Sequence, residues 1–156
     1  PKELGLEGVA ESKIRQALDL IKGSELEGSV ILVEDSGIFL DAFPEWPGAQ
    51  SSDVEKEIGL EGIIDRVNES GNSGAEYRAV AILSDGNQVW KSQGICRGKI
   101  SDYPRGSNGF GYDPIFIPEE GGGGTFGELG KEIKNQISHR KKVMQGLSNL
   151  LKSPSR

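Results

Sequence analysis

The order of apolar and polar residues along the chain predicts helices at both ends and in the first half. Over residues 6–22 apolar side chains recur at the three-to-four-residue spacing of one helix face. Residues 51–59 and 60–69 have the composition of two short helices, with Gly59 as the break between them. A last helical element is expected over residues 131–152, where an apolar face is accompanied by basic residues.

Shorter apolar or alternating runs predict strands between these helices. The expected strands cover residues 29–33, 37–42, 75–83, 88–100 and 112–117. The Asp85-Gly86 step between the third and fourth runs is typical of a tight hairpin, because both residues tolerate positive φ. The mixture of helices and strands predicts an α/β fold, and no internal repeat or linker divides residues 1–156 into more than one domain.

Composition narrows the class of protein. The chain has 156 residues, 35% of them hydrophobic and 27% charged, which is typical of a folded soluble domain. The formal net charge of −6 argues against binding along a DNA or RNA backbone, which requires a basic face. A single nucleotide, held through a metal ion and a few local cations, remains compatible with this charge.

The single cysteine and the absence of targeting signals favour a reducing, cytoplasmic setting. With Cys96 alone, no disulfide can form within the chain. Cys96 lies in an alternating stretch with no activating group nearby, so a buried structural cysteine is favoured over a reactive thiol. No segment is long and apolar enough to cross a membrane, and no signal peptide is visible, although the sequence starts at Pro1 rather than at Met.

The first candidate site is the segment Glu34-Asp35-Ser36-Gly37, placed at the end of the first expected strand. A carboxylate there, beside a glycine that lets a ligand approach, suits a magnesium ligand or a base that activates water. The alternative is a solvated turn between two strands, and the tetrapeptide by itself fits that alternative better.

A second candidate site is the glycine-rich segment over residues 106–114. Its glycines expose backbone N–H groups and allow the loop to follow a ligand. Phe110 and Tyr112 offer flat faces on which a base can stack. The alternative is a loose loop whose two aromatic side chains fill the core, and the glycine spacing does not decide between them.

The third candidate site, over residues 134–140, holds the only histidine of the chain. Lys134, His139 and Arg140 provide hydrogen-bond donors, and Arg140 has no acceptor. A purine with oxygen at position 6 accepts such a bond, whereas adenine presents an amino group and leaves a buried donor unpaired. The alternative is the basic start of a helix that carries a surface histidine.

Taken together and in this order, the segments resemble the inosine triphosphate pyrophosphatase family from about residue 5 to the end. The matching stretches are residues 33–37 (VEDSG), 46–48 (WPG), 109–116 (GFGYDPIF), 125–129 (TFGEL), 134–135 (KN) and 137–140 (ISHR). The resemblance, together with the strand and helix pattern, predicts a central mixed, twisted sheet flanked by helices, with a nucleotide cleft between two lobes.

The resemblance implies Mg²⁺-dependent hydrolysis of ITP, dITP and XTP to the monophosphate and pyrophosphate. In that picture Asp35 is the general base or a metal ligand, and Glu3 is the nearest candidate for an acidic metal ligand before the first helix. The expected substrate contacts are Lys13, Ser36, Phe110, Gly111, Tyr112, Asp113, Lys134, His139 and Arg140.

One part of the family pattern has no counterpart in the sequence. Family members begin with a strand and a glycine-asparagine and lysine loop that cradles the triphosphate, and nothing here matches it. A truncated sequence, a diverged gene and a second molecule that supplies the lost part are three explanations.

Two other functions compete with nucleotide hydrolysis by this family. One is that of a catalytically silent relative that binds nucleotides or assembles with itself, and the other is that of a Maf-like nucleotide pyrophosphatase. A homodimer, including one with exchanged strands, is expected because a lost central strand exposes sheet edges.

Overall fold

The computed structural model describes residues 5–152, with the side chains of Arg140 and Lys152 left out of the description. Its four-stranded sheet has the order β1 (Ile31–Leu40), β2 (Gly74–Ser84), β3 (Val89–Ile100) and β4 (Phe116–Pro118). Each neighbouring pair is antiparallel, so these strands do not form the mixed sheet that was expected. The β2–β3 hairpin turns at Asp85 and Gly86, as predicted, and the α/β class is confirmed.

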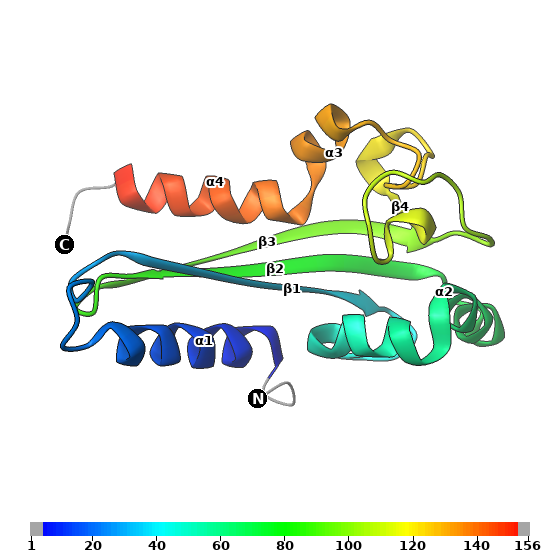
Figure 1. The fold of residues 1–156 in the computed structure, drawn as a ribbon. Helices are drawn as coiled ribbons and strands as arrows, with labels where there is room; N and C mark the ends of the chain where they lie inside the picture. The colour runs from blue at the N-terminus through cyan, green and yellow to red at the C-terminus, as the bar shows by residue number, and fades with distance from the viewer. Residues whose placement is uncertain (1–4, 153–156) are drawn as a thin grey trace.

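Helices cover both faces of the sheet. Helices α1 (Gly5–Ile21) and α2 (Ser51–Ser70) lie on one side, and α3 (Lys131–Ile137) and α4 (His139–Lys152) lie on the other (Figure 1). Three short 3₁₀ turns join the elements, at Gly48–Gln50, Asp113–Ile115 and Glu119–Gly121. This arrangement leaves the middle of β1 beside the starts of α2 and α4.

The apolar faces of α1 and α4 explain their docking. Leu6, Ala10 and Ile14 of α1 recur every four residues and pack against apolar side chains of β1 and β2. On the opposite face, Val143 and Leu147 of α4 pack against Ala79 and Ala81 of β2, with Trp90 of β3 beside them. Both helices therefore pack against the long central hairpin, and this packing fixes the positions of their N-terminal turns.

Three predicted boundaries were wrong, and the first of them concerns β1. Residues 29–33 and 37–42 were expected as two strands separated by a polar turn, but β1 runs without a break through Glu34, Asp35 and Ser36. These three residues pair in register with Ala81, Val80 and Ala79 of β2, so backbone pairing outweighs side-chain polarity. Two of these polar residues, Asp35 and Ser36, also line a cavity.

The second error concerns the last helical element. Ser138 has an extended backbone, with φ −70° and ψ 155°, and separates α3 from α4. The strand expected at residues 112–117 is likewise a 3₁₀ turn followed by the short β4. The predicted break at Gly59 is confirmed, since its φ of 71° and ψ of 172° interrupt α2.

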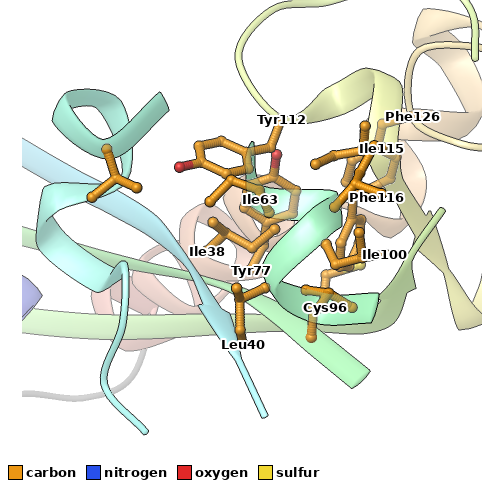
Figure 2. Close-up of a cluster of buried hydrophobic side chains, with 14 of the residues drawn as sticks. Ile38, Leu40, Ile63, Tyr77, Cys96, Ile100, Tyr112, Ile115, Phe116 and Phe126 are labelled. Atoms are coloured by element: carbon orange, nitrogen blue, oxygen red, sulfur yellow. The ribbon is translucent and has the colours of Figure 1, made fainter. Parts of the chain in front are cut away.

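A cluster of aromatic and aliphatic side chains fills the space between α2, the sheet and the loop that precedes β4 (Figure 2). The ring of Tyr77 lies at its centre, with ring centroids 4.7 Å from Phe116 and 5.8 Å from Phe126. Cys96 is buried in the same cluster, as expected, and burial raises the pKa of its thiol to about 11. Tyr77, Tyr112 and Phe126 belong both to this core and to the wall of the candidate site.

Candidate active site

A cavity of about 950 Å³ opens between β1, the start of α2, the glycine-rich loop and the starts of α3 and α4. All three segments identified in the sequence contribute to its wall. The predicted residues among its lining are Asp35, Ser36, Phe110, Gly111, Tyr112, Asp113, Lys134 and His139. The tertiary structure thus gathers into one site groups that are as much as about a hundred positions apart in the sequence.

The sequence predicted Asp35 at the end of a strand. In the structure Asp35 lies within β1. Its side chain is 18% exposed, and Oδ1 is 3.4 Å from the ammonium nitrogen of Lys13 on α1. Its second oxygen, Oδ2, is buried and accepts no hydrogen bond within the described residues. Lys13 is not part of the cavity wall and reaches the site through this ion pair and a 3.4 Å contact with the carbonyl oxygen of Glu34.

The glycine-rich loop is held in shape by the buried carboxylate of Asp113. Its Oδ2 accepts a hydrogen bond from the backbone N–H of Phe110 at 3.0 Å and another from the ammonium of Lys134 at 2.6 Å. Gly109 makes this geometry possible, because it has a φ of 74° and a Cβ there would lie 2.0 Å from the same oxygen. The loop is therefore fastened to α3 and is not loose.

The two aromatic residues of the loop have different positions. Phe110 is 67% exposed at the cavity and lies with its ring centroid 5.3 Å from the nitrogen of Lys134. Tyr112 is buried, and its hydroxyl donates a 2.7 Å hydrogen bond to the carbonyl oxygen of Ser51 (Figure 2 shows its ring beside Ile63). Burial, and then the negative charge of Glu55, raises the pKa of the Tyr112 hydroxyl. Of the two rings, Phe110 is the one accessible to a flat ligand.

His139 is a buried residue of the cavity wall and not a surface histidine. It is only 6% exposed, and its ring stacks on Tyr77 with centroids 4.5 Å apart and planes inclined by 6°. Ser138, extended between α3 and α4, turns the chain so that His139 begins α4 at the cavity. The predicted side-chain contact of Arg140 lies outside the described side chains, and Glu3 lies outside the described residues.

Part of the cavity wall was not predicted from the sequence. It comes from the first turns of α2, with Ser51, Ser52 and Glu55, and from Lys131 and Lys141 near the starts of α3 and α4. No pattern in the segment after Pro47-Gly48 indicated that a helix start would face the site. Its contribution follows from the packing of α2 against the aromatic core.

The metal-binding capacity of the described residues is limited to isolated carboxylates. No group of three or more histidine, cysteine, aspartate or glutamate side chains within residues 5–152 is arranged to hold a metal ion. Asp35, with its unsatisfied Oδ2, is the carboxylate whose chemistry fits a shared ion best. Mg²⁺ is commonly held by one or two carboxylates together with phosphate oxygens and water, so Asp35 meets that minimum.

Fold and cavity together describe an α/β protein with an acid, an exposed aromatic ring and a stacked imidazole around one large pocket. The model of the Ham1 family matches residues 2–150, and the chain belongs to this family. The resemblance identified from the sequence motifs is thereby confirmed.

Individual relatives agree with this assignment. A dITP/XTP pyrophosphatase of Pyrobaculum aerophilum is 40% identical over 120 residues, which cover 77% of this chain and 64% of that protein. One of Methanopyrus kandleri is 42% identical over 131 residues, covering 83% of this chain and 69% of that protein. The chain therefore spans about two thirds of the length of these relatives.

Solved structures confirm the fold. The Ham1 protein of Staphylococcus aureus matches with a TM-score of 0.82 and 27% identity, over 94% of this chain and 76% of that one. A nucleoside-triphosphatase, dITP/XTP pyrophosphatase, of Mycobacterium abscessus matches with a TM-score of 0.69 and 28% identity, over 92% of this chain and 75% of that one. Among the described helices, none has the length and apolar character needed to span a lipid bilayer.

Proposed function

We propose that this protein hydrolyses deaminated purine nucleoside triphosphates (ITP, dITP and XTP) to the nucleoside monophosphate and pyrophosphate. The observation that carries the proposal is the shared cavity of Asp35, the Phe110 loop and His139. The names of relatives such as those of P. aerophilum and M. kandleri, both called dITP/XTP pyrophosphatases, support the substrate class. A cytoplasmic location of this protein and a single domain over residues 1–156 remain predictions from the sequence.

The base would lie against Phe110, since this ring is exposed at the cavity and the neighbouring ring of Tyr112 is buried. Stacking on an aromatic side chain stabilises any base and does not select among bases. Selection would come from hydrogen-bond donors of the cavity wall: the remaining ammonium hydrogens of Lys134, the imidazole of His139 and, as the sequence predicts, Arg140. An oxygen at position 6 of the purine accepts from such donors, whereas the amino group of adenine does not.

The phosphates would extend from the base toward β1, because Asp35 and Lys13 lie there. Asp35, and Glu3 if it approaches the site, would hold Mg²⁺ together with phosphate oxygens. When bound, the ion neutralises the triphosphate charge. In the alternative role, as general base and not as an ion ligand, Asp35 would accept a proton through the unsatisfied Oδ2 from a water molecule whose oxygen forms a bond to the α-phosphorus. The bond between the α- and β-phosphates breaks, and pyrophosphate leaves. Ser36, the next residue of β1, would contact the phosphates.

A second candidate is a relative that binds the nucleotide but turns it over slowly or not at all. The observation that favours it is the sparse metal site, since within residues 5–152 no three acidic or histidine side chains converge on an ion. Positioning and charge neutralisation provide most of the rate enhancement in phosphoryl chemistry, so a weak metal site would leave binding without efficient hydrolysis. Calorimetry with ITP, compared with a pyrophosphate-release assay, separates the two candidates.

The direct test is the Asp35→Asn substitution, assayed as Mg²⁺-dependent release of pyrophosphate from ITP. Asparagine keeps the size of the side chain and cannot accept a proton at neutral pH. We expect kcat to fall by about a hundredfold or more, while the thermal unfolding midpoint changes little. ATP should be a much poorer substrate than ITP for the unmodified protein.

Asp19→Asn is the matched control, since Asp19 is an exposed residue of α1 and does not line the cavity. This variant should retain the activity of the unmodified protein. If Asp35→Asn releases pyrophosphate as fast as the Asp19 variant, the role assigned to Asp35 is wrong. If the unmodified protein binds ITP without any release, the second candidate function replaces the first.

A further inference from the structure

Ser51, the first residue of α2, is hydrogen-bonded to two separate segments of the cavity wall. Its Oγ accepts a hydrogen bond from the backbone N–H of Ile38 on β1 at 2.9 Å and donates one to the carbonyl oxygen of Gly48 at 2.6 Å. Its carbonyl oxygen accepts a 2.7 Å hydrogen bond from the hydroxyl of Tyr112, which belongs to the glycine-rich loop. A chain of hydrogen bonds therefore runs from the loop, through the start of α2, to β1.

This chain of hydrogen bonds is buried and closely packed. Tyr112, Ser51 and Ile38 are all buried, so water does not compete for their hydrogen bonds. A Cβ on Gly37 would lie 2.1 Å from the carbonyl oxygen of Gly48 and 3.1 Å from the Oγ of Ser51. The backbone of β1 and the start of α2 are therefore in direct contact beside Ile38, and a shift of one moves the other.

The chain of hydrogen bonds ends on the strand that carries Asp35. Ile38 follows Asp35 by three positions in β1. It also pairs in register with Tyr77 of β2, the residue on which the His139 ring stacks. Since β1 is an edge strand of the described sheet, β2 holds one of its edges, and Ser51 holds the other edge at Ile38. The orientation of Asp35 toward the cavity therefore depends on how Ser51 fixes this part of β1.

We propose that Tyr112 is a positioning residue, whose hydroxyl acts through Ser51 to hold β1 in the place that orients Asp35 toward the substrate. A tyrosine hydroxyl has a single hydrogen, and this one is donated to the Ser51 carbonyl oxygen, so it is not used to bind the base. The inference rests on the proposed function, because it assumes that Asp35 takes part in hydrolysis. It assigns the loop a second task besides presenting Phe110.

The first test is Tyr112→Phe, which keeps the ring and removes the hydroxyl. A small misplacement of a reacting group lowers the rate strongly, so kcat for pyrophosphate release from ITP should fall by about tenfold. The Kd for IMP, measured by calorimetry, should change by less than about twofold, because the hydroxyl serves the reaction and not binding. A weaker affinity for IMP with an unchanged kcat would make Tyr112 a binding residue and overturn the inference.

The second test repeats the substitution in the Asp35→Asn background. A residue that acts through Asp35 has nothing left to position there, so Tyr112→Phe should not lower the residual rate further. A tenfold loss in both backgrounds would show that Tyr112 acts independently of Asp35, and it would overturn the inference. Circular dichroism at the assay temperature checks that every variant is folded.

A third readout needs no activity. Hydrogen exchange at the Ile38 amide, followed by NMR, reports how firmly Ser51 holds β1. Loss of one buried hydrogen bond in the chain should make this exchange about fivefold faster in Tyr112→Phe. An unchanged exchange rate at Ile38 would mean that the Tyr112 hydroxyl does not act through Ser51, and it would overturn the inference.

Tyr103→Phe is the matched control, because Tyr103 is an exposed loop residue and is not part of the cavity wall. Its kcat, its Kd for IMP and its exchange at Ile38 should equal those of the unmodified protein. A kcat of Tyr112→Phe equal to that of this control overturns the inference. An unmodified protein that releases no pyrophosphate overturns the proposed function instead, and the exchange measurement then still decides whether Tyr112 holds β1, so the two failures are distinguishable.

Discussion

At the scale of single residues, the site depends on a buried ion pair that joins two distant segments. Asp113 of the glycine-rich loop and Lys134 of α3 are 2.6 Å apart, and both are largely buried. The same aspartate oxygen fixes the backbone of Phe110. A charge pair in such a place shapes the loop more than it stabilises the fold, because desolvation offsets much of the attraction between buried charges.

Asp113→Asn is expected to weaken both the site and the fold. The substitution leaves the charge of Lys134 buried without its partner, which should lower the free energy of unfolding by about 3 kcal/mol. The Phe110 loop loses its anchor, so the Kd for IMP should rise by about tenfold, a change of about 1.4 kcal/mol. Urea unfolding and calorimetry measure the two effects.

Asp102→Asn provides the comparison, because Asp102 is an exposed loop residue outside the cavity. It should leave both quantities close to those of the unmodified protein. An Asp113→Asn variant that binds IMP normally would mean that the loop keeps its shape without this ion pair.

At the scale of secondary-structure elements, the close approach of α4 to β3 decides where His139 lies. A Cβ on Gly94 of β3 would be 2.2 Å from the carbonyl oxygen of His139 and 2.6 Å from the backbone nitrogen of Val143. These are backbone atoms of the first turns of α4, which a small side-chain movement cannot relieve. Glycine at position 94 therefore allows the helix to reach the sheet and places the imidazole on Tyr77.

Gly94→Ala should move α4 away from the sheet. Overpacking in a close contact typically costs 1–3 kcal/mol, and we expect a loss of about 2 kcal/mol in the free energy of unfolding. Affinity for IMP should fall as well, since His139 moves with the helix. Urea unfolding monitored by circular dichroism, together with calorimetry, checks both expectations.

Gly130→Ala is the control for the added methyl group. No heavy atom lies within 4 Å of a Cβ built there, and the φ of −68° suits any residue. Equal stabilities of the Gly94 and Gly130 variants would contradict the packing argument.

At the scale of the whole molecule, β1 is an edge strand of the described sheet, and its first part carries exposed apolar side chains. Val30, the residue just before β1, and Leu32 within it are 62% and 45% exposed. Toward its other end, β1 is covered, because Ser51 exchanges hydrogen bonds with Ile38 and the Trp46 carbonyl accepts from the Leu40 backbone N–H. The unpaired backbone N–H and C=O groups of such an edge strand can form hydrogen bonds with a strand of another molecule.

We therefore expect the protein to form a dimer at micromolar concentration, measured by size exclusion with light scattering. Leu32→Lys should shift the population toward monomer, because a lysine on an edge strand disfavours pairing. Leu20→Lys, on the exposed end of α1, should leave the dimer intact. A single monomeric species of the unmodified protein at micromolar concentration would refute the expectation.

The sequence alone determined the types of most elements and predicted several residues of the cavity wall. Helical spacing located α1, glycine marked the break in α2, and Asp-Gly marked the β2–β3 turn, because these signals are local. Motif order identified Asp35, the Phe110 loop and His139 for the same reason, since each segment carries its chemistry in a few adjacent residues.

Only the tertiary structure decided how these pieces are used. Asp35 lies in the middle of a strand because β1 pairs with β2, although local polarity had predicted a turn there. Core packing buries Tyr112 and leaves Phe110 exposed. Glu55 became a wall residue because α2 docks on the aromatic core. Contacts between distant segments have free energies that outweigh local preferences, and no short window of sequence contains them.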